Sequence, residues 1–435
     1  MSDVLVVGAG AAGAEAALTS ARLGSQVTLV YAGELGGTCV NAGCVPSNAL
    51  LHAAATRRAG FDIEAAHTAA GRVVNRVRDG VRRSLAAAGV HLLAGRLSFQ
   101  DAHTATVAGP DGEIIVTADR IVIATGATTY LPAVGDVGDR RVITSADALG
   151  LGAVPARAVV VVGGHLGLEW ATLLRHAGTQ VTVIDEQPTL RAVADAEVAE
   201  FVAGQLGVTV LVGSPVAAVK PADDEVLVSV ADQEIGADLV LFADFRRPNT
   251  DGLGLDRIGV RVDDSGAVVV DDELRTTAPG ISAAGDVTGG LMLAAEARVE
   301  GGLAAANLHG GSTPMRRDLV PRALHTDPEV ASVGLTESQA RDAGRPPAVG
   351  YAEYAGNARA LVLGADGGVV KLVVDPVGEE ILGATVVGPD AASTVALVAL
   401  AMQAELTASD LIASNHAHPA VGELVVDAAR AALAG

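Results

Sequence analysis

The chain has 435 residues, half of them apolar, which is enough for two to four domains with sizeable hydrophobic cores. A formal net charge of −21 argues against nucleic acid and against an anionic membrane surface as partners. We predict a cytoplasmic protein, because a strand pattern begins at Val4 with no signal segment before it, and glycines and Pro215 interrupt the apolar stretch 201–219.

The chain opens with a predicted strand (3–7), a glycine-rich turn, a helix to about Leu23 and a second strand (27–31). The turn, GAGAAG, has the spacing of a dinucleotide-binding motif and stands between the required strand and helix. Its glycines are Gly8, Gly10 and Gly13. They would permit the tight turn, a close approach to a pyrophosphate and helix packing, with the helix N-terminus facing the phosphates. A glycine-rich turn without a ligand is the alternative.

The only two cysteines of the chain, Cys39 and Cys44, lie in the segment GGTCVNAGC. A zinc site would need histidine ligands, because no second cysteine pair exists, and we predict no metal. A structural disulfide would close too small a loop to stabilise the fold much. We therefore favour a dithiol that cycles with its disulfide. If the segment opens a helix, the helix dipole would favour a thiolate, which is the form that attacks disulfides.

A second strand–turn–helix–strand pattern begins after Pro155 and ends at Asp185, which suggests a second nucleotide. Its turn is imperfect. Either Val162 stands in the first glycine position, ahead of Gly164 and Gly167, or the turn starts at Gly163 and is one residue short.

Two apolar strands of similar form, 120–127 and 281–287, end in small residues that would let the backbone pass close to a ligand. The second reaches Asp286, whose carboxylate could bond ligand hydroxyls or its own turn. From Met315 the pattern changes to mixed strands and helices, such as 369–375 and 391–404, which indicates an α+β third domain.

Near the C-terminus, NHAHPAVGE contains His416, His418 and Glu423. A dithiol cycle needs a group that exchanges protons near neutral pH, and histidine is the natural candidate. A carboxylate five residues on could orient its ring. The alternative is a surface histidine without a role.

Taken in order, the motifs resemble the class I flavoprotein disulfide oxidoreductases, which include dihydrolipoamide dehydrogenase, glutathione reductase, mycothione reductase and mercuric reductase. The resemblance runs along nearly the whole chain: GAGAAG, GGTCVNAGCVPS, IATGA, the second nucleotide fold, RRPNT, AAGDVTGG, TDPEVASVGLTESQA and HAHP. It implies an α/β protein with two Rossmann-like domains and a C-terminal α+β dimerisation domain. The expected ranges are 1–150 with 276–314 for FAD binding, 151–275 for the NAD(P)-binding-like domain and 315–435 for dimerisation.

The resemblance also implies roles for single residues. Cys44 would face the flavin of FAD, and Cys39 would meet a thiol or disulfide substrate. His418, oriented by Glu423, would act as acid and base in the partner's site across a homodimer interface. The expected nucleotide contacts are Gly8, Gly10, Ala12, Gly13, Tyr31, Gly37, Thr38, Asn48, Thr125, Gly126 and Asp286 for FAD, with Gly164, Gly167, Glu169 and Asp185 in the second fold.

Several positions depart from the family pattern. Tyr31 replaces the acid that binds the adenosine ribose of FAD, and Asn48 replaces the lysine that pairs with the glutamate at Glu169. Val162 and Phe245 stand where the family has glycine. Except for Tyr31 these departures bear on the nicotinamide half-reaction, whereas the cysteines and histidine are intact.

Three hypotheses follow for the function. The first is an FAD-dependent thiol–disulfide oxidoreductase, with NADH, favoured by Asp185 over NADPH, as an electron partner left open. The second is a dithiol oxidase that passes electrons to oxygen because its nicotinamide site is degenerate. The third is a flavin-binding redox sensor without turnover.

Overall fold

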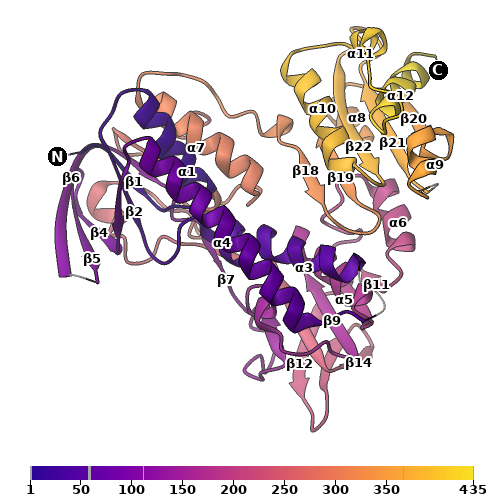
Figure 1. The fold of residues 1–435 in the computed structure, drawn as a ribbon, viewed down its shortest axis with the longest axis horizontal. Coiled ribbons are helices and arrows are strands. Elements are labelled where there is room, and N and C mark those ends of the chain that lie inside the picture. Colours follow the sequence, from indigo (N-terminus) through magenta and orange to yellow (C-terminus); the bar gives the residue numbers. More distant parts are fainter. Residues whose placement is uncertain (1, 57–59, 111, 366, 435) are drawn as a thin grey trace. The chain divides into compact units, whose positions relative to one another are not determined.

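A computed structural model describes residues 2–56, 60–110, 112–365 and 367–434. Its contacts divide the chain into two compact units, and Figure 1 labels most of their elements. The first unit comprises Met1–Leu131, Ala146–Gly152 and Phe245–Met315, and the second comprises Pro132–Ser145, Ala153–Asp244 and Arg316–Gly435. Within the described ranges, no helix combines the length and hydropathy that crossing a membrane would need.

The first unit is built on a sheet with the order β3-β2-β1-β6-β5-β4, with β17 paired to β6. The strands β3, β2, β1, β6 and β17 run parallel, as a dinucleotide fold requires. The strands are β1 (Ser2–Val7), β2 (Val27–Tyr31), β3 (His91–Ala94), β4 (Arg96–Asp101), β5 (Thr104–Gly109), β6 (Gly112–Ile123) and β17 (Ile281–Ala283), beside the small pair β7 (Ala127–Thr129) and β16 (Arg246–Pro248). The helices are α1 (Ala11–Arg22), α2 (Gly37–Ala42), α3 (Cys44–Thr56), α4 (Ile63–Ala87) and α7 (Ala294–Leu308).

Two hydrophobic cores cover the two faces of this sheet, because successive side chains of a strand point to opposite sides. Leu5 of β1 belongs to one core and its neighbour Val4 to the other. Helices α1 and α7 lie side by side over the Val4 face (Figure 1). Gly301 of α7 permits this approach, since a Cβ there would collide with the backbone of Ala12 in α1.

The second unit contains another parallel sheet, ordered β11-β10-β9-β15-β8, and an antiparallel sheet, β12-β13-β14. These strands are β8 (Val142–Thr144), β9 (Arg157–Val162), β10 (Gln180–Asp185), β11 (Thr209–Val212), β12 (Val216–Pro221), β13 (Val226–Val230), β14 (Gln233–Ala237) and β15 (Leu239–Ala243). Helix α5 (His165–His176) follows β9, and α6 (Ala196–Gln205) precedes β11.

The C-terminal part of the second unit is an antiparallel sheet, β18-β19-β22-β21-β20. Helix α10 packs on β19 and β22, and α12 packs on β20 and β21. The strands are β18 (Arg322–Leu324), β19 (Val330–Gly334), β20 (Ala348–Glu353), β21 (Val369–Val374) and β22 (Ile381–Val387). The helices are α8 (Glu337–Asp342), α9 (Ala358–Val362), α10 (Ala391–Gln403), α11 (Ala408–Ala413) and α12 (Glu423–Ala434).

The architecture is the predicted one, with two dinucleotide folds and a C-terminal α+β domain. The two units differ from the expected ranges at two places. Residues 132–145, expected with the first fold, lie in the second unit. Residues 245–275, expected in the second fold, lie in the first unit, because Leu253, Leu255 and Ile258 join the core of its sheet.

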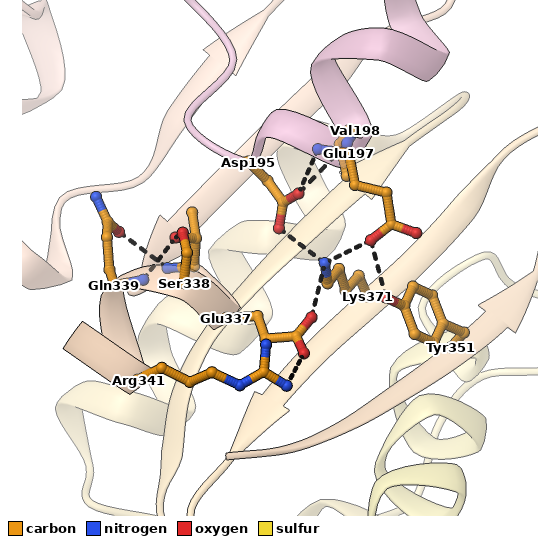
Figure 2. Close-up of polar contacts among 10 residues, drawn as sticks. Asp195, Glu197, Val198, Glu337, Ser338, Gln339, Arg341, Tyr351 and Lys371 are labelled. Atoms are coloured by element: carbon orange, nitrogen blue, oxygen red, sulfur yellow. Dashed lines mark hydrogen bonds and ion pairs between the residues drawn. The ribbon is translucent and has the colours of Figure 1, made fainter. Parts of the chain in front are cut away.

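A buried lysine ties helix α6 to the C-terminal sheet within the second unit (Figure 2). Lys371 of β21 is 2% exposed, and its Nζ lies 3.0 Å from Asp195 Oδ2, 2.9 Å from Glu197 Oε2 and 3.4 Å from Glu337 Oε2. Asp195 also caps α6 by accepting hydrogen bonds from two backbone N–H groups. Burial alone would lower the pKa of Lys371, but hydrogen bonds with Glu197 and Asp195 outweigh it and raise that pKa.

Replacing this lysine should weaken the second unit. Lys371→Met keeps the apolar stem but leaves Asp195 and Glu197 without their cation, while Glu337 keeps its ion pair with Arg341, so we expect the free energy of unfolding to fall by about 3–5 kcal/mol. Chemical denaturation measures the change. The exposed Lys220, the other lysine of the chain, supplies the control: Lys220→Met should change stability by about 0.5 kcal/mol or less. Equal effects of the two substitutions would contradict this account of the cluster.

Candidate active site

The cysteine segment, residues 36–44, packs directly against the first dinucleotide turn, residues 8–13. The backbone N–H of Gly36 donates to the Ala9 carbonyl at 2.8 Å. Gly37 has a φ of +61°, and a Cβ on it would lie 2.6 Å from the Cα of Gly10. Only glycine allows the two backbones to approach this closely in that conformation. The two motifs that the sequence analysis singled out separately are therefore one structural feature.

The three glycines of the first turn lie where the motif requires them. Gly8 follows β1 with a φ of +113°, and a Cβ there would collide with the Ala124 carbonyl. Gly10 precedes the first residue of α1, and a Cβ on Gly13 would collide with the Gly8 carbonyl. The turn thus presents bare backbone at the N-terminus of a helix, the arrangement that binds a pyrophosphate.

The two thiols lie on consecutive short helices. Cys39 is in α2 and partly buried, and Cys44 is the first residue of α3 and exposed. A hydrogen bond from the Cys44 thiol lowers the pKa of Cys39, while burial opposes it. The positive charge of Arg246 lowers that pKa further, and the negative charge of Asp286 raises it. The net effect is a lowered pKa of the Cys39 thiol.

Arg246 and Asp286 form an ion pair beside the thiols, with Arg246 Nη1 3.2 Å from Asp286 Oδ2 and both side chains largely buried. Strand β16 places Arg246 by pairing antiparallel with β7. Asn249, just after β16, donates from its side chain to the Thr125 carbonyl, and its backbone N–H donates to that of Gly126. The predicted Thr125–Gly126 turn is therefore held by the RRPNT segment.

Sequence reasoning missed Arg246, Asn249 and also Asn41. The Asn41 side chain donates to the carbonyls of Leu35 and Gly37, and its oxygen accepts from Arg78 of α4. Asn41 therefore holds the backbone at the start of the cysteine segment in place. These three residues lie in the motifs RRPNT and GGTCVNAGC, but the spacing within a motif does not show which of its polar side chains holds a backbone turn.

The structure also places the other residues that were predicted to contact FAD. Tyr31 ends β2, and Thr38 lies in α2 next to Cys39. Ala12 is buried in the second position of α1. Asn48 donates its side-chain amide to the Cys44 carbonyl at 3.0 Å, one turn earlier in α3. In the structure this side chain therefore supports the helix that starts at Cys44.

In the second turn two residues, Gly163 and Gly164, separate β9 from α5, one fewer than the three that separate β1 from α1. Strand β9 ends at Val162. The Val162 side chain packs on Gly167, where a Cβ would lie 2.9 Å from Val162 Cγ2. Asp185 ends β10, as predicted, but its carboxylate is fully buried.

Glu169 of α5 is buried and accepts the backbone N–H of His325 at 3.0 Å. The His325 ring in turn lies 2.9 Å from Glu329 Oε1. That hydrogen bond raises the pKa of His325 against the effect of its burial, and the charge of Glu169 adds to the rise. Glu169 therefore lies beside a histidine whose pKa is raised. Its expected relation to Asn48 stays a prediction.

The two C-terminal histidines are distinguished by their partners. His418 Nδ1 lies 3.0 Å from Glu423 Oε1, whereas His416 Nε2 lies 2.8 Å from the Ser414 hydroxyl. Glu423 opens α12, and its other oxygen accepts the Ala420 N–H. This backbone bond, followed by the one to His418, lowers the pKa of Glu423. The exposed His418 ring is thus oriented by an ionised carboxylate.

Comparisons with known proteins cover nearly the whole chain. Residues 2–301 match the family described as pyridine nucleotide-disulphide oxidoreductase, and residues 320–429 match its dimerisation domain. A dihydrolipoyl dehydrogenase of Geobacillus stearothermophilus is 35% identical over 454 residues, which cover 99% of this chain and 96% of the relative. A dihydrolipoyl dehydrogenase of Chlorobaculum tepidum is 35% identical over 455 residues, covering 99% and 97%.

Solved structures of flavoprotein disulfide reductases are similar to this chain over nearly its whole length. The Cu(II) complex of the HOCl-induced flavoprotein disulfide reductase RclA from Escherichia coli has a TM-score of 0.90 at 30% identity and covers 99% of both chains. LpdA from Mycobacterium tuberculosis has a TM-score of 0.91 at 28% identity, covering 98% of this chain and 99% of that one. Homologues in this family use FAD and NAD(H). The chain belongs to the pyridine nucleotide-disulphide oxidoreductase family and is a flavin oxidoreductase that acts on sulfur groups.

Proposed function

We propose that this protein is an FAD-dependent thiol–disulfide oxidoreductase whose Cys39–Cys44 pair exchanges with a small-molecule or protein-bound thiol or disulfide. The flavin, when bound, would take up or give back the two electrons of the dithiol. The proposal rests on one observation: the segment that contains the two hydrogen-bonded thiols packs against a dinucleotide turn. The contact between Gly37 and Gly10 makes this packing possible.

The residues of the first unit fit FAD. The turn from Gly8 to Gly13 leaves backbone and a helix N-terminus open to a pyrophosphate. Asp286 lies three residues after the end of β17, where a carboxylate could accept from ligand hydroxyls, and Thr125 and Gly126 form the neighbouring turn. Tyr31 at the end of β2 offers a phenol in place of the family's ribose-binding acid.

The protein residues would handle substrate and protons. As a thiolate, Cys39 would attack a disulfide substrate, which forms a mixed disulfide and releases one substrate thiolate. In the opposite direction a substrate thiolate would attack Cys39 of the oxidised Cys39–Cys44 disulfide, which forms the mixed disulfide and releases Cys44 as a thiolate. His418, oriented by Glu423, would take and return the proton. We infer a homodimer in which the C-terminal domain forms the interface and brings His418 to the partner's thiols. A reducing cytoplasm would suit this dithiol.

A second candidate function is a dithiol oxidase. The buried Asp185 favours it, because this residue was expected to recognise NADH. A dithiol substrate would become a disulfide, and its two electrons and two protons would reduce oxygen to hydrogen peroxide. Peroxide formed in step with dithiol consumption would favour this function, and rapid, saturable reduction of the flavin by micromolar NADH would count against it.

The thiols should be indispensable for turnover. Replacing either sulfur in Cys39→Ser or Cys44→Ser removes the pair that exchanges with substrate, so dithiol-dependent turnover should fall to the level of a protein-free solution. Thr56→Ala, at the far end of α3, should keep normal turnover. Full activity of Cys44→Ser would refute the mechanism, and a wild-type protein that turned over no dithiol would favour the sensor hypothesis.

The ion pair beside the thiols predicts two shifts of opposite sign. Arg246→Gln removes a positive charge and should raise the pKa of Cys39, while Asp286→Asn removes a negative charge and should lower it. The pH dependence of Cys39 alkylation, followed by mass spectrometry of the peptide, measures both. Arg247→Gln is the control, since this neighbour is exposed and lies over the Tyr130 ring. Shifts of the same sign would contradict the electrostatic account.

His418 and His416 form a matched pair for testing proton transfer. His418→Gln should lower the rate of turnover by about 10²–10⁴-fold, the usual contribution of a general acid–base group. His416→Gln, two residues away, should lower it by no more than about twofold. The loss of turnover in Glu423→Gln should lie between those of the two histidine variants, and this variant should also change the pH profile of turnover. Equal losses for both histidine variants would argue for a merely structural role of this segment.

A further inference from the structure

A carboxylate of the protein itself lies on the second dinucleotide turn. The first backbone N–H groups of a helix have no partner within the helix, and they are the groups that hold a bound pyrophosphate. At the start of α5 the N–H of Leu166 is already taken, because it donates to Asp244 Oδ2 at 2.5 Å. The anion at this helix end is thus supplied by the chain.

The glycine of this turn accommodates the same side chain. A Cβ on Gly164 would lie 2.8 Å from the Cβ of Asp244 and 3.0 Å from its Oδ2. In a dinucleotide site the glycine at this position leaves room for the pyrophosphate. Here the room beside Gly164 is filled by Asp244. In the first turn, by contrast, the corresponding glycine, Gly10, faces the bare backbone of Gly37.

The backbone holds Asp244 in this place. It directly follows β15, which pairs in parallel with β9 up to the register Ala243 with Val162. The N–H of Gly163 donates to the Ala243 carbonyl at 2.7 Å, which fixes the turn against the strand end. Asp244 has a φ of +65°, a conformation that aspartate and asparagine tolerate better than most residues.

The ribose end of the second fold is closed independently. Asp185, expected to bind ribose hydroxyls, is fully buried, and both of its oxygens are engaged. Oδ1 accepts from the Gln187 N–H and from Arg191 Nε, each at 3.0 Å, and Oδ2 accepts from the Arg191 N–H at 2.8 Å. A ribose would have to displace a buried ion pair.

We propose that Asp244 excludes the pyrophosphate of a pyridine dinucleotide from the second fold, so that NAD(H) and NADP(H) are not the electron partners of this chain. The residues present do not fit either nucleotide. The inference deepens the proposed function by removing one electron partner from it, and the fold keeps its dinucleotide architecture as a scaffold. If Asp244 were only a helix cap, its charge would have no effect on nucleotide binding.

Direct binding to the holoenzyme tests the proposal without any turnover. With FAD occupying the first turn, isothermal titration calorimetry with NAD⁺ should give a dissociation constant of about 1 mM or weaker for the wild type. Asp244→Asn keeps the size and the tolerated φ but removes the charge, and Asp244→Gly removes the whole side chain. At least one of the two should bind NAD⁺ at least about tenfold more tightly than the wild type.

Two controls make the result specific. Adenosine, which has no phosphate, should bind the wild type and both variants equally. Asp62→Asn changes a carboxylate that caps another helix, α4, and should leave NAD⁺ binding unchanged. Micromolar binding of NAD⁺ to the wild type, or no tighter binding in either Asp244 variant, would overturn the proposal. Neither outcome affects the thiol function, which the cysteine variants test separately.

Discussion

The contact between Gly37 and Gly10 is the constraint on which the rest of the site depends. It brings the backbone of the cysteine segment against the turn where the first nucleotide would place its phosphates, closer than any side chain would allow. Asn41 and the Gly36 N–H hold the segment there. The positions of the thiols are therefore set by the scaffold of the nucleotide site. The pKa of Cys39 is then lowered by its hydrogen bond with Cys44 and by Arg246, and raised by burial and by Asp286.

The two dinucleotide folds of the chain have the same plan but opposite local chemistry. In the first fold Gly8, with a positive φ, follows the strand, and no side chain caps the helix, whereas in the second fold the turn is one residue shorter and the helix end carries Asp244. The second fold is nevertheless firmly built into its unit, since Asp195 and Glu197 of its α6 region meet Lys371 of the C-terminal sheet. On the proposal that Asp244 excludes the pyrophosphate, this packing would keep the second fold in place without a nucleotide.

Much of this could be read from the sequence, because glycine spacing, strand alternation and the cysteine segment each have a strong local signal. The fold class and the family were predicted in this way. Asp244 was not, since an acidic residue at a strand end is typical of any turn, and only the pairing of β15 with β9 brings it to α5. Arg246 was missed for the same reason: its effect on Cys39 arises from strand pairing between β16 and β7. Long-range contacts decided what the local pattern could not.

The central claim is that the thiols exchange electrons with a flavin held on the first turn. Anaerobic addition of a small dithiol to the purified holoenzyme, with the visible absorbance of the flavin recorded over time, tests it most directly. The account predicts that the dithiol bleaches the flavin in the wild type and leaves it oxidised in a protein that lacks both sulfurs. A flavin that stays oxidised in the wild type, or that is bleached equally fast without the sulfurs, would contradict it.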